Sequence, residues 1–370
     1  MFLILNKGNM KKIEFKIYKS LLMLVMIGFS IFGFTSCGSD DDSGQDIEEV
    51  GGTGDEETLE DEEEVTEGGN EGSVDEGEGV EDDEIEEEED IEEECISVFN
   101  INLDPTDCNV SLDFESSYTE IENEETRIRT IVVNNIPDHL TGEFPNMGNP
   151  NTIAEIDNAY VMTMDPVLAN RSTSTGGFVS GILFSGVGLE VQTAETFVNM
   201  YTGVANPDWN IVALQSAENL GLDCNNAHVQ PTGQYHYHGA PSAYIDDLGI
   251  DGTEMVKLGY AADGFPIYYK YGYTEEGTVI TAFESGYNLI EGERPGDGET
   301  APDGCYDGTY SQDYEFVGGT GLDECNGRTG RTPESEREYY YLITDNWPSA
   351  PICLSGTPDI SFRFAGGGNN

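Results

Sequence analysis

The stretch CNNAHVQPTGQYHYHG, residues 224–239, contains three of the four histidines of the chain. Its last part, 235–238, alternates tyrosine with histidine, and a β-strand places successive side chains on opposite faces. His236 and His238 are therefore predicted to share one face of a strand. The Pro-Thr-Gly between them and His228 is typical of a turn, which would bring His228 back beside the pair.

Three imidazoles that converge from two strands are typical ligands of Zn²⁺ or Cu²⁺. His228, His236 and His238 are therefore the candidate metal ligands. If the ion keeps a position open for water, metal-assisted hydrolysis becomes possible chemistry. The alternative is structural, with the histidines bonded to one another and to backbone carbonyls so that they order a loop.

Outward from this stretch, short β-branched and aromatic runs alternate with Gly, Pro, Asn and Asp, as in strands joined by turns. These runs lie at 126–136, 159–164, 178–192, 254–273, 337–346 and 359–366. Helical periodicity is confined to about one stretch, near 193–204. The pattern predicts a mainly β fold, a single large sandwich-like domain with few short helices, over residues 95–370. No internal repeat is evident.

Two other loops contain candidate catalytic residues. Asp263-Gly264 is typical of a hairpin turn, and the Asp263 carboxylate is also a candidate metal ligand or base. Near Cys325, Glu324 and Arg328 are expected to pair with each other, or Arg328 binds an anionic group of a substrate. The chain has neither a Gly-x-Ser-x-Gly nor a His-Glu-x-x-His motif to support a metal-free enzyme. Whether the protein is an enzyme therefore stays open.

Tyrosine is abundant, with 19 in the chain, and several lie in runs on predicted strands. Packing is the favoured interpretation of these runs, because aromatic residues are common packing residues in β proteins. Aromatic surfaces also bind sugars. The alternative function is therefore a non-catalytic binding or adhesion module whose tyrosine-rich loops recognise a glycan or a protein. The residues concerned are Tyr268, Tyr269, Tyr271, Tyr273, Tyr339, Tyr340 and Tyr341.

The first part of the chain has the composition of a targeting segment and a tether. Residues 1–36 are predicted to be a lipoprotein signal peptide, with a lysine-rich start, an apolar run and small residues directly before Cys37. Cys37 would then carry the lipid. Residues 37–94 contain 31 Asp and Glu and no Lys or Arg, which predicts a disordered acidic linker. Its clustered carboxylates are also candidates for loose Ca²⁺ binding.

The sequence also indicates a location and limits the partners. The CGSDDD that begins at Cys37 resembles the surface-export signal of Bacteroidetes-type lipoproteins, which implies an outer-membrane lipoprotein exposed at the cell surface. The net charge of −58 repels phosphate backbones and anionic headgroups. Nucleic acid is therefore not expected as a partner, and the lipid anchor is the only expected membrane contact.

Six cysteines remain besides Cys37, an even number that predicts disulfides in an oxidising exterior. Thiolate zinc ligands are the competing interpretation, but the chain lacks close CxxC pairs. Six cysteines allow 15 pairings. The preferred pairing is Cys95–Cys108, Cys305–Cys325 and Cys224–Cys353.

Several segments together resemble the YHYH-domain family, named for the motif at 235–238. They are LDCNNAHVQPTGQYHYHGAP, LGYAADGFPIYYKYGY, LDECNGRTGRTPE with the later YYYLITD, NNIPDHLTGEFPN and GILFSGVGLEV. The resemblance covers most of residues 125–358 and implies domain boundaries more than chemistry. Because His139 lies in one of these segments, the resemblance adds it as a further candidate ligand.

Overall fold

The computed structural model describes Cys95 and residues 101–364. The predicted signal peptide, the lipidation site Cys37 and the acidic linker lie outside these residues. Within the described part, none of the helices has the length and apolar character that crossing a membrane requires.

The fold is mainly β with few short helices, which confirms the predicted fold class. The strands are β1 (Tyr118–Asn123), β2 (Ile128–Val133), β3 (Asn158–Thr163), β4 (Thr173–Ser174), β5 (Gly181–Leu183), β6 (Gly188–Leu189), β7 (Thr196–Val198), β8 (Ala205–Asn210), β9 (Ala227–Val229), β10 (Tyr235–Tyr237), β11 (Lys257–Ala261), β12 (Pro266–Tyr269), β13 (Tyr271–Tyr273), β14 (Ile280–Ala282), β15 (Tyr287–Leu289), β16 (Tyr314–Phe316), β17 (Gly327–Gly330), β18 (Glu338–Ile343) and β19 (Cys353–Leu354). The helices are η1 (Pro105–Asp107), η2 (Ala213–Ser216), α1 (Ala217–Leu220), α2 (Ser242–Asp247), η3 (Ser311–Asp313) and η4 (Ile360–Phe362).

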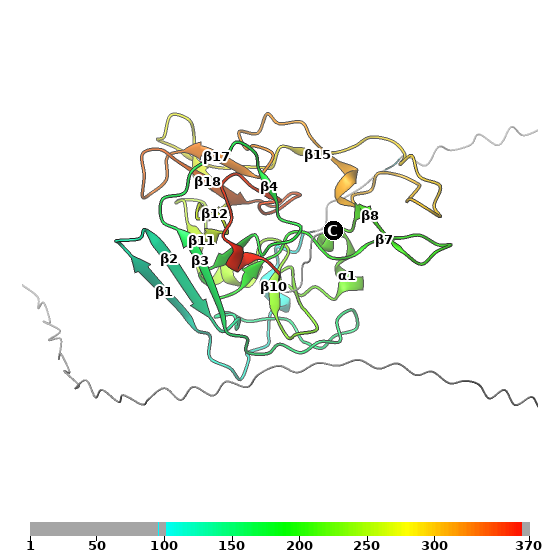
Figure 1. Cartoon of the computed structure of the whole chain (residues 1–370), viewed down its shortest axis with the longest axis horizontal. Coiled ribbons are helices and arrows are strands. Elements are labelled where there is room, and N and C mark those ends of the chain that lie inside the picture. Colours follow the sequence, from blue (N-terminus) through cyan, green and yellow to red (C-terminus); the bar gives the residue numbers. More distant parts are fainter. Residues whose placement is uncertain (1–94, 96–100, 365–370) are drawn as a thin grey trace, which may run out of the picture. The chain divides into compact units, whose positions relative to one another are not determined.

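An eight-stranded sheet forms the centre of the domain, in the order β17-β18-β12-β11-β5-β6-β10-β9. Figure 1 shows β17, β18, β12 and β11 one after another in this order. A separate three-stranded sheet, β1-β2-β3, contributes Ile131, Val133, Tyr160 and Met162 to the same hydrophobic core as the large sheet. Two layers therefore share one core, as the sandwich-like prediction requires.

The large sheet is built twice from the same unit, a feature that the sequence did not reveal. In the first half-sheet, β10 lies next to the hairpin β5-β6 and is parallel to β6, and β9 pairs with β10 at the edge of the sheet. In the second half-sheet, the hairpin β11-β12 is followed by β18, parallel to β12, and by β17 at the edge. The structure therefore contains an internal repeat that is not evident in the sequence.

The local hydrogen bonds repeat as well. Before each edge strand, an aspartate closes a turn by accepting the backbone N–H groups two and four residues later; these are Asp223 and Asp323. Its second oxygen accepts the hydroxyl of the first tyrosine of the inner strand, at 2.7 Å from Tyr235 and 2.8 Å from Tyr339. The same side chains thus perform the same structural task in both halves.

The halves meet at the antiparallel pair β5-β11. Tyr260 lies opposite Ile182, flanked by the pairs Gly259–Leu183 and Ala261–Gly181. This register is that of a pseudo-twofold axis through the central pair. A Cβ on Gly259 would lie 2.2 Å from the carbonyl oxygen of Ile182, so the close approach of the two strands requires glycine there.

Two local predictions were wrong. Residues 193–204 do not form a helix but contain β7 and the turn of the hairpin β7-β8, in which the Asn199 side chain accepts hydrogen bonds from the N–H groups of Tyr201 and Thr202. At 359–366, the described part forms η4 instead of a strand, because the Asp359 side chain accepts the N–H of Ser361 and caps it.

All six cysteines outside residues 1–94 are paired, but the preferred pairing was wrong. The disulfides are Cys95–Cys305, Cys108–Cys224 and Cys325–Cys353. Two of them join segments more than 100 residues apart, with sequence separations of 210 and 116. The preference for local loops failed because the fold brings Cys108 to the turn before β9 and Cys95 to Cys305, both across long stretches of chain.

Candidate metal centre

The hairpin β9-β10 places the three clustered histidines. His236 lies directly opposite His228 in the antiparallel register. In the connecting loop, the Gln230 N–H donates to the Gln234 carbonyl and the N–H of Gly233, at φ +93°, donates to the Gln230 carbonyl. Tyr235 and Tyr237 enter the hydrophobic core on one face, so the alternation of the strand sends His236 and the following His238 to the other face.

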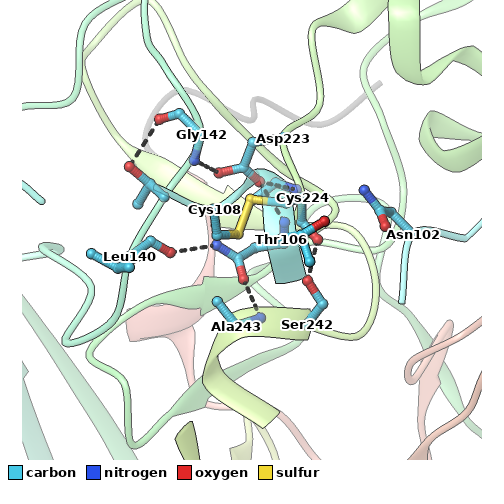
Figure 2. Close-up of a disulfide and its surroundings, with 12 residues drawn as sticks. Asn102, Thr106, Cys108, Leu140, Gly142, Asp223, Cys224, Ser242 and Ala243 are labelled. Atoms are coloured by element: carbon cyan, nitrogen blue, oxygen red, sulfur yellow. Dashed lines mark hydrogen bonds between the residues drawn. A yellow bond between two sulfur atoms is a disulfide. The ribbon is translucent and has the colours of Figure 1, made fainter. Parts of the chain in front are cut away.

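The turn that leads into β9 is fixed from several sides. Cys224, directly after Asp223, is joined to Cys108 (Figure 2). Asp223 also accepts the backbone N–H of Gly142 at 3.0 Å, and the neighbouring Asn225 donates to the Leu140 carbonyl at 2.9 Å. The start of the histidine hairpin is thereby held in place before His228 is reached.

The three imidazole rings surround a common centre. Their centroids are 4.7 Å (His228–His236), 4.8 Å (His228–His238) and 4.8 Å (His236–His238) apart. One ring nitrogen from each histidine lies within 4.8 Å of the others, a grouping that could hold a metal ion. The Nε2 atoms of His228 and His238 are 3.1 Å apart, close to the separation of about 3.3 Å between two nitrogens that bind zinc tetrahedrally at 2.0–2.1 Å.

The other ring nitrogens indicate which atoms face the centre. His228 Nδ1 lies 2.9 Å from the Leu220 carbonyl oxygen and His236 Nδ1 lies 3.4 Å from that of Gln234. A carbonyl oxygen can only accept a hydrogen bond, so Nδ1–H is the donor and the Nε2 lone pair of His228 is free to bind a metal. The lone pair of His228 Nε2 therefore points at His238 Nε2.

Two arrangements fit this short contact between nitrogens. If His238 Nε2–H donates to His228, its own Nδ1 is left buried, unprotonated and without a hydrogen-bond partner. If a cation lies between the Nε2 atoms, both Nε2 lone pairs bind it and the proton of His238 is on Nδ1. Both arrangements leave His238 Nδ1 without a hydrogen-bond partner, and only the second explains why two unprotonated nitrogens lie this close.

Burial keeps the cluster neutral. Loss of hydration lowers the pKa of His238 to about 3 and that of His236 well below its usual value, and it also lowers the pKa of His228. The like charge that each neighbouring imidazole would carry adds to the effect for His236 and His238. The free nitrogens therefore have lone pairs available at neutral pH, as metal binding requires.

A buried carboxylate accompanies the histidines. Glu190, 4% exposed, follows β6 and has Oε2 at 3.7 Å from His236 Nε2. Its two oxygens accept the side-chain amides of Gln230 at 2.8 Å and Gln234 at 3.1 Å. Burial raises its pKa to about 8. Sequence reasoning missed Glu190, although an acid within the apolar run GVGLEV was a signal that could have found it.

His139 is not part of the cluster. Its Nδ1 lies 2.8 Å from the Leu140 carbonyl oxygen, and its Nε2 accepts the hydroxyl of Tyr237 at 2.6 Å. Tyr237 points to the core face of β10, opposite His236 and His238. The expectation that His139 joins the metal ligands is therefore wrong, because the sheet separates it from them.

The three catalytic candidates lie in the second half-sheet. Asp263 lies in the hairpin turn between β11 and β12, as predicted, and accepts the Tyr341 hydroxyl at 2.6 Å and the Gly356 N–H at 2.8 Å. The Arg328 guanidinium lies 4.3 Å from the centre of the Phe283 ring, and no ion pair joins it to the exposed Glu324 among the described residues. None of the three belongs to the histidine group.

The second half-sheet shows which residues occupy the histidine positions when the same strand pairing forms without histidine. The register pairs Arg328 with Tyr340 where the first half pairs His228 with His236. Leu342 takes the place of His238, since its N–H bonds to Asn326 as that of His238 bonds to the equivalent Asn226. Tyr340 and Leu342 belong to a small apolar cluster. The same strands therefore form with different side chains on this face.

A profile of the YHYH protein family matches residues 159–356. The chain belongs to this family. The matched segment of this YHYH protein contains both half-sheets and the whole histidine cluster, whereas His139 precedes it. The comparisons with curated proteins and with solved structures found no match.

Proposed function

We propose that this protein binds a divalent transition metal ion through His228, His236 and His238. Zinc and copper are the first candidates, because neutral imidazole suits both ions. With three protein nitrogens, the ion keeps at least one further position. A water bound there would be acidified and could act as a nucleophile, so metal-assisted hydrolysis is the activity to be tested once the ion is identified.

The comparison between the half-sheets carries this proposal. Groups with a structural task recur in both halves, as do Asp223 and Asp323, or Tyr235 and Tyr339. The histidines do not recur, although the strand pairing does. A purely structural role for the imidazoles is therefore disfavoured, because the second half-sheet forms the same pairing without them.

The proposal includes a location at the cell surface. The lipid on Cys37 would anchor the protein in the outer membrane, and the acidic segment 37–94 would hold the metal-binding domain away from the bilayer. Support comes from the signal-like sequence before Cys37 and from the three disulfides of the domain, which form in oxidising compartments. A Cys37→Ser variant should lose lipid labelling and leave the membrane fraction; unchanged labelling would contradict the anchor.

Metal analysis of the purified full-length protein tests the metal site. We expect about one equivalent of Zn²⁺ or Cu²⁺ after reconstitution and removal of excess ion, and a His236→Ala variant should lose it. The matched control is Tyr340→Ala in the second half-sheet, which alters the equivalent strand position. A wild-type protein that retains no ion, or a His236→Ala variant that retains it, would rule out the site.

The alternative as a glycan- or protein-binding module receives less support. Five of the seven tyrosines that the sequence places in runs are buried, and Tyr271 and Tyr273 are partly exposed. The aromatic runs thus serve the core, as the packing interpretation expected. Glycan binding that persists in the His236→Ala variant would favour the alternative.

A further inference from the structure

The buried carboxyl group of Glu190 has no Lys or Arg partner among the described residues. The side chain is nearly fully buried, and its hydrogen bonds come from the neutral amides of Gln230 and Gln234. Among the described residues, His236 is the only basic residue within ion-pair distance of Glu190, with 3.7 Å between His236 Nε2 and Glu190 Oε2. A buried carboxyl group stays ionised only beside a cation, and a metal ion in the histidine cluster would be such a cation.

The strand pairing directs Glu190 to the histidine face. Gly188 of β6 lies beside His236 of the parallel strand β10, and Leu189 lies beside Tyr237. Residues in register on neighbouring strands point to the same face, so Glu190 shares its face with His236 and His238. Two side-chain amides from the β9-β10 loop then hold the carboxylate in position.

The duplicated half-sheet gives an internal comparison. Ile267 of β12 lies beside Tyr341 as Leu189 lies beside Tyr237, so the position equivalent to Glu190 is Tyr268. Tyr268 belongs to the apolar cluster of the second half-sheet. The carboxylate is thus present in the half that has the three histidines and absent from the half that has none.

We propose that Glu190 is the fourth protein ligand of the centre, so that a divalent ion is held by three imidazole nitrogens and one carboxylate oxygen. This inference rests on the proposed metal-binding function and narrows it: with Glu190 bound, a four-coordinate ion has no position for water, so hydrolysis would require a five-coordinate ion. The carboxylate is a hard, anionic donor, so the set favours a divalent ion such as Zn²⁺ over soft Cu⁺. Glu190 Oε2 lies 3.7 Å from His236 Nε2, longer than the spacing of about 3.3 Å on one zinc ion, and only the three histidine nitrogens lie within 4.8 Å of one another. The carboxylate would therefore move toward the centre when the ion binds.

The test compares wild type with Glu190→Gln in the full-length protein. Zn²⁺ affinity is measured by competition with a chromogenic chelator, and Co²⁺ serves as a spectroscopic probe of the ligand set. We expect Glu190→Gln to bind Zn²⁺ at least about 10-fold more weakly, since supporting groups outside the ligand set alone contribute 10–100-fold. The visible absorption bands of bound Co²⁺ should shift, which a merely structural role for Glu190 would not cause.

The control variant is Tyr268→Phe, at the equivalent position of the second half-sheet, which should leave both readouts unchanged. Urea unfolding of the metal-free proteins checks that Glu190→Gln folds. If Glu190→Gln keeps the wild-type affinity and Co²⁺ spectrum while His236→Ala loses the ion, the fourth ligand is refuted and the proposed function stands. If wild type itself binds no ion, both fail.

Discussion

Histidine side chains lie on both faces of β10, but their hydrogen-bond partners differ. His139 meets Tyr237 on the core face through a single well-formed hydrogen bond, whereas His236 and His238 meet other imidazoles on the opposite face. Each nitrogen of His139 has a protein partner. A structural histidine is thus distinguished from a candidate ligand by whether its second nitrogen has a partner outside the group of imidazoles.

His139 should make the protein sensitive to acid. Burial lowers its pKa from 6.5 to about 4, so between these values the unfolded chain binds a proton that the folded protein does not. The folded state therefore loses stability as the pH falls below 6.5. Relative to His139→Gln, the free energy of unfolding of wild type should fall by up to about 1.4 kcal/mol per pH unit. Urea unfolding at pH 7, 6 and 5 measures this, and a difference that stays constant with pH would contradict it.

Tyr340 should be replaceable at little cost. Its hydroxyl is buried without a hydrogen-bond partner, and burying such a group is unfavourable. Tyr340→Phe is expected to raise the free energy of unfolding by up to about 1 kcal/mol. The equivalent change His236→Phe should instead abolish metal binding. A Tyr340→Phe protein that unfolds at much lower urea concentration would show that the hydroxyl has a partner.

At the scale of elements, the junction of β5 and β11 should tolerate no side-chain growth. A Cβ at Gly259 would collide with the backbone of Ile182, which cannot yield without separating the strands. Gly259→Ala is expected to lower the free energy of unfolding by about 1–3 kcal/mol, the usual cost of overpacking. Gly177→Ala is the control, because a Cβ there meets nothing within 4 Å. Equal stability of the two variants in urea would show that the junction is loose.

The two disulfides beside the edge strands should have separable effects. Cys108–Cys224 fixes the turn before β9, whereas Cys325–Cys353 fixes the turn before β17. Replacing the first pair with serine should weaken Zn²⁺ binding by about 10-fold, since it holds the approach to His228. Replacing the second pair should lower stability and leave Zn²⁺ affinity unchanged. Chelator competition on both double variants decides, and equal losses of affinity would contradict the assignment.

Local elements could be predicted where a short sequence pattern by itself determines the backbone conformation. The alternation of Tyr and His fixed the faces of β10, and Pro-Thr-Gly and Asp-Gly marked the two hairpin turns. The stretch 193–204 misled because a helical pattern specifies a helix only where a face can be buried, and Val198, Met200, Tyr201 and Val204 are exposed.

For the whole molecule, sequence patterns gave the fold class but not the long-range partners. Glu190 reaches the histidines through the parallel pairing of β6 with β10, although 45 residues separate it from His236 in the sequence and no local pattern marks the contact. Two of the disulfides likewise join positions 210 and 116 residues apart. The duplication was hidden because the two halves share only the few residues that close turns and pack strands, such as Asp223 and Asp323.

The contact between β5 and β11 is self-complementary, since each half-sheet offers the other an equivalent strand edge. A polypeptide containing one half alone would leave that edge unpaired, and unpaired edges recruit further chains. Isolated halves should therefore associate, either with a second copy of themselves through a true twofold axis or with each other when co-expressed. Because both halves belong to one chain, the edge strand of each half always has the other half to pair with. The two halves can then differ in their side chains, and the three clustered histidines belong to the first half.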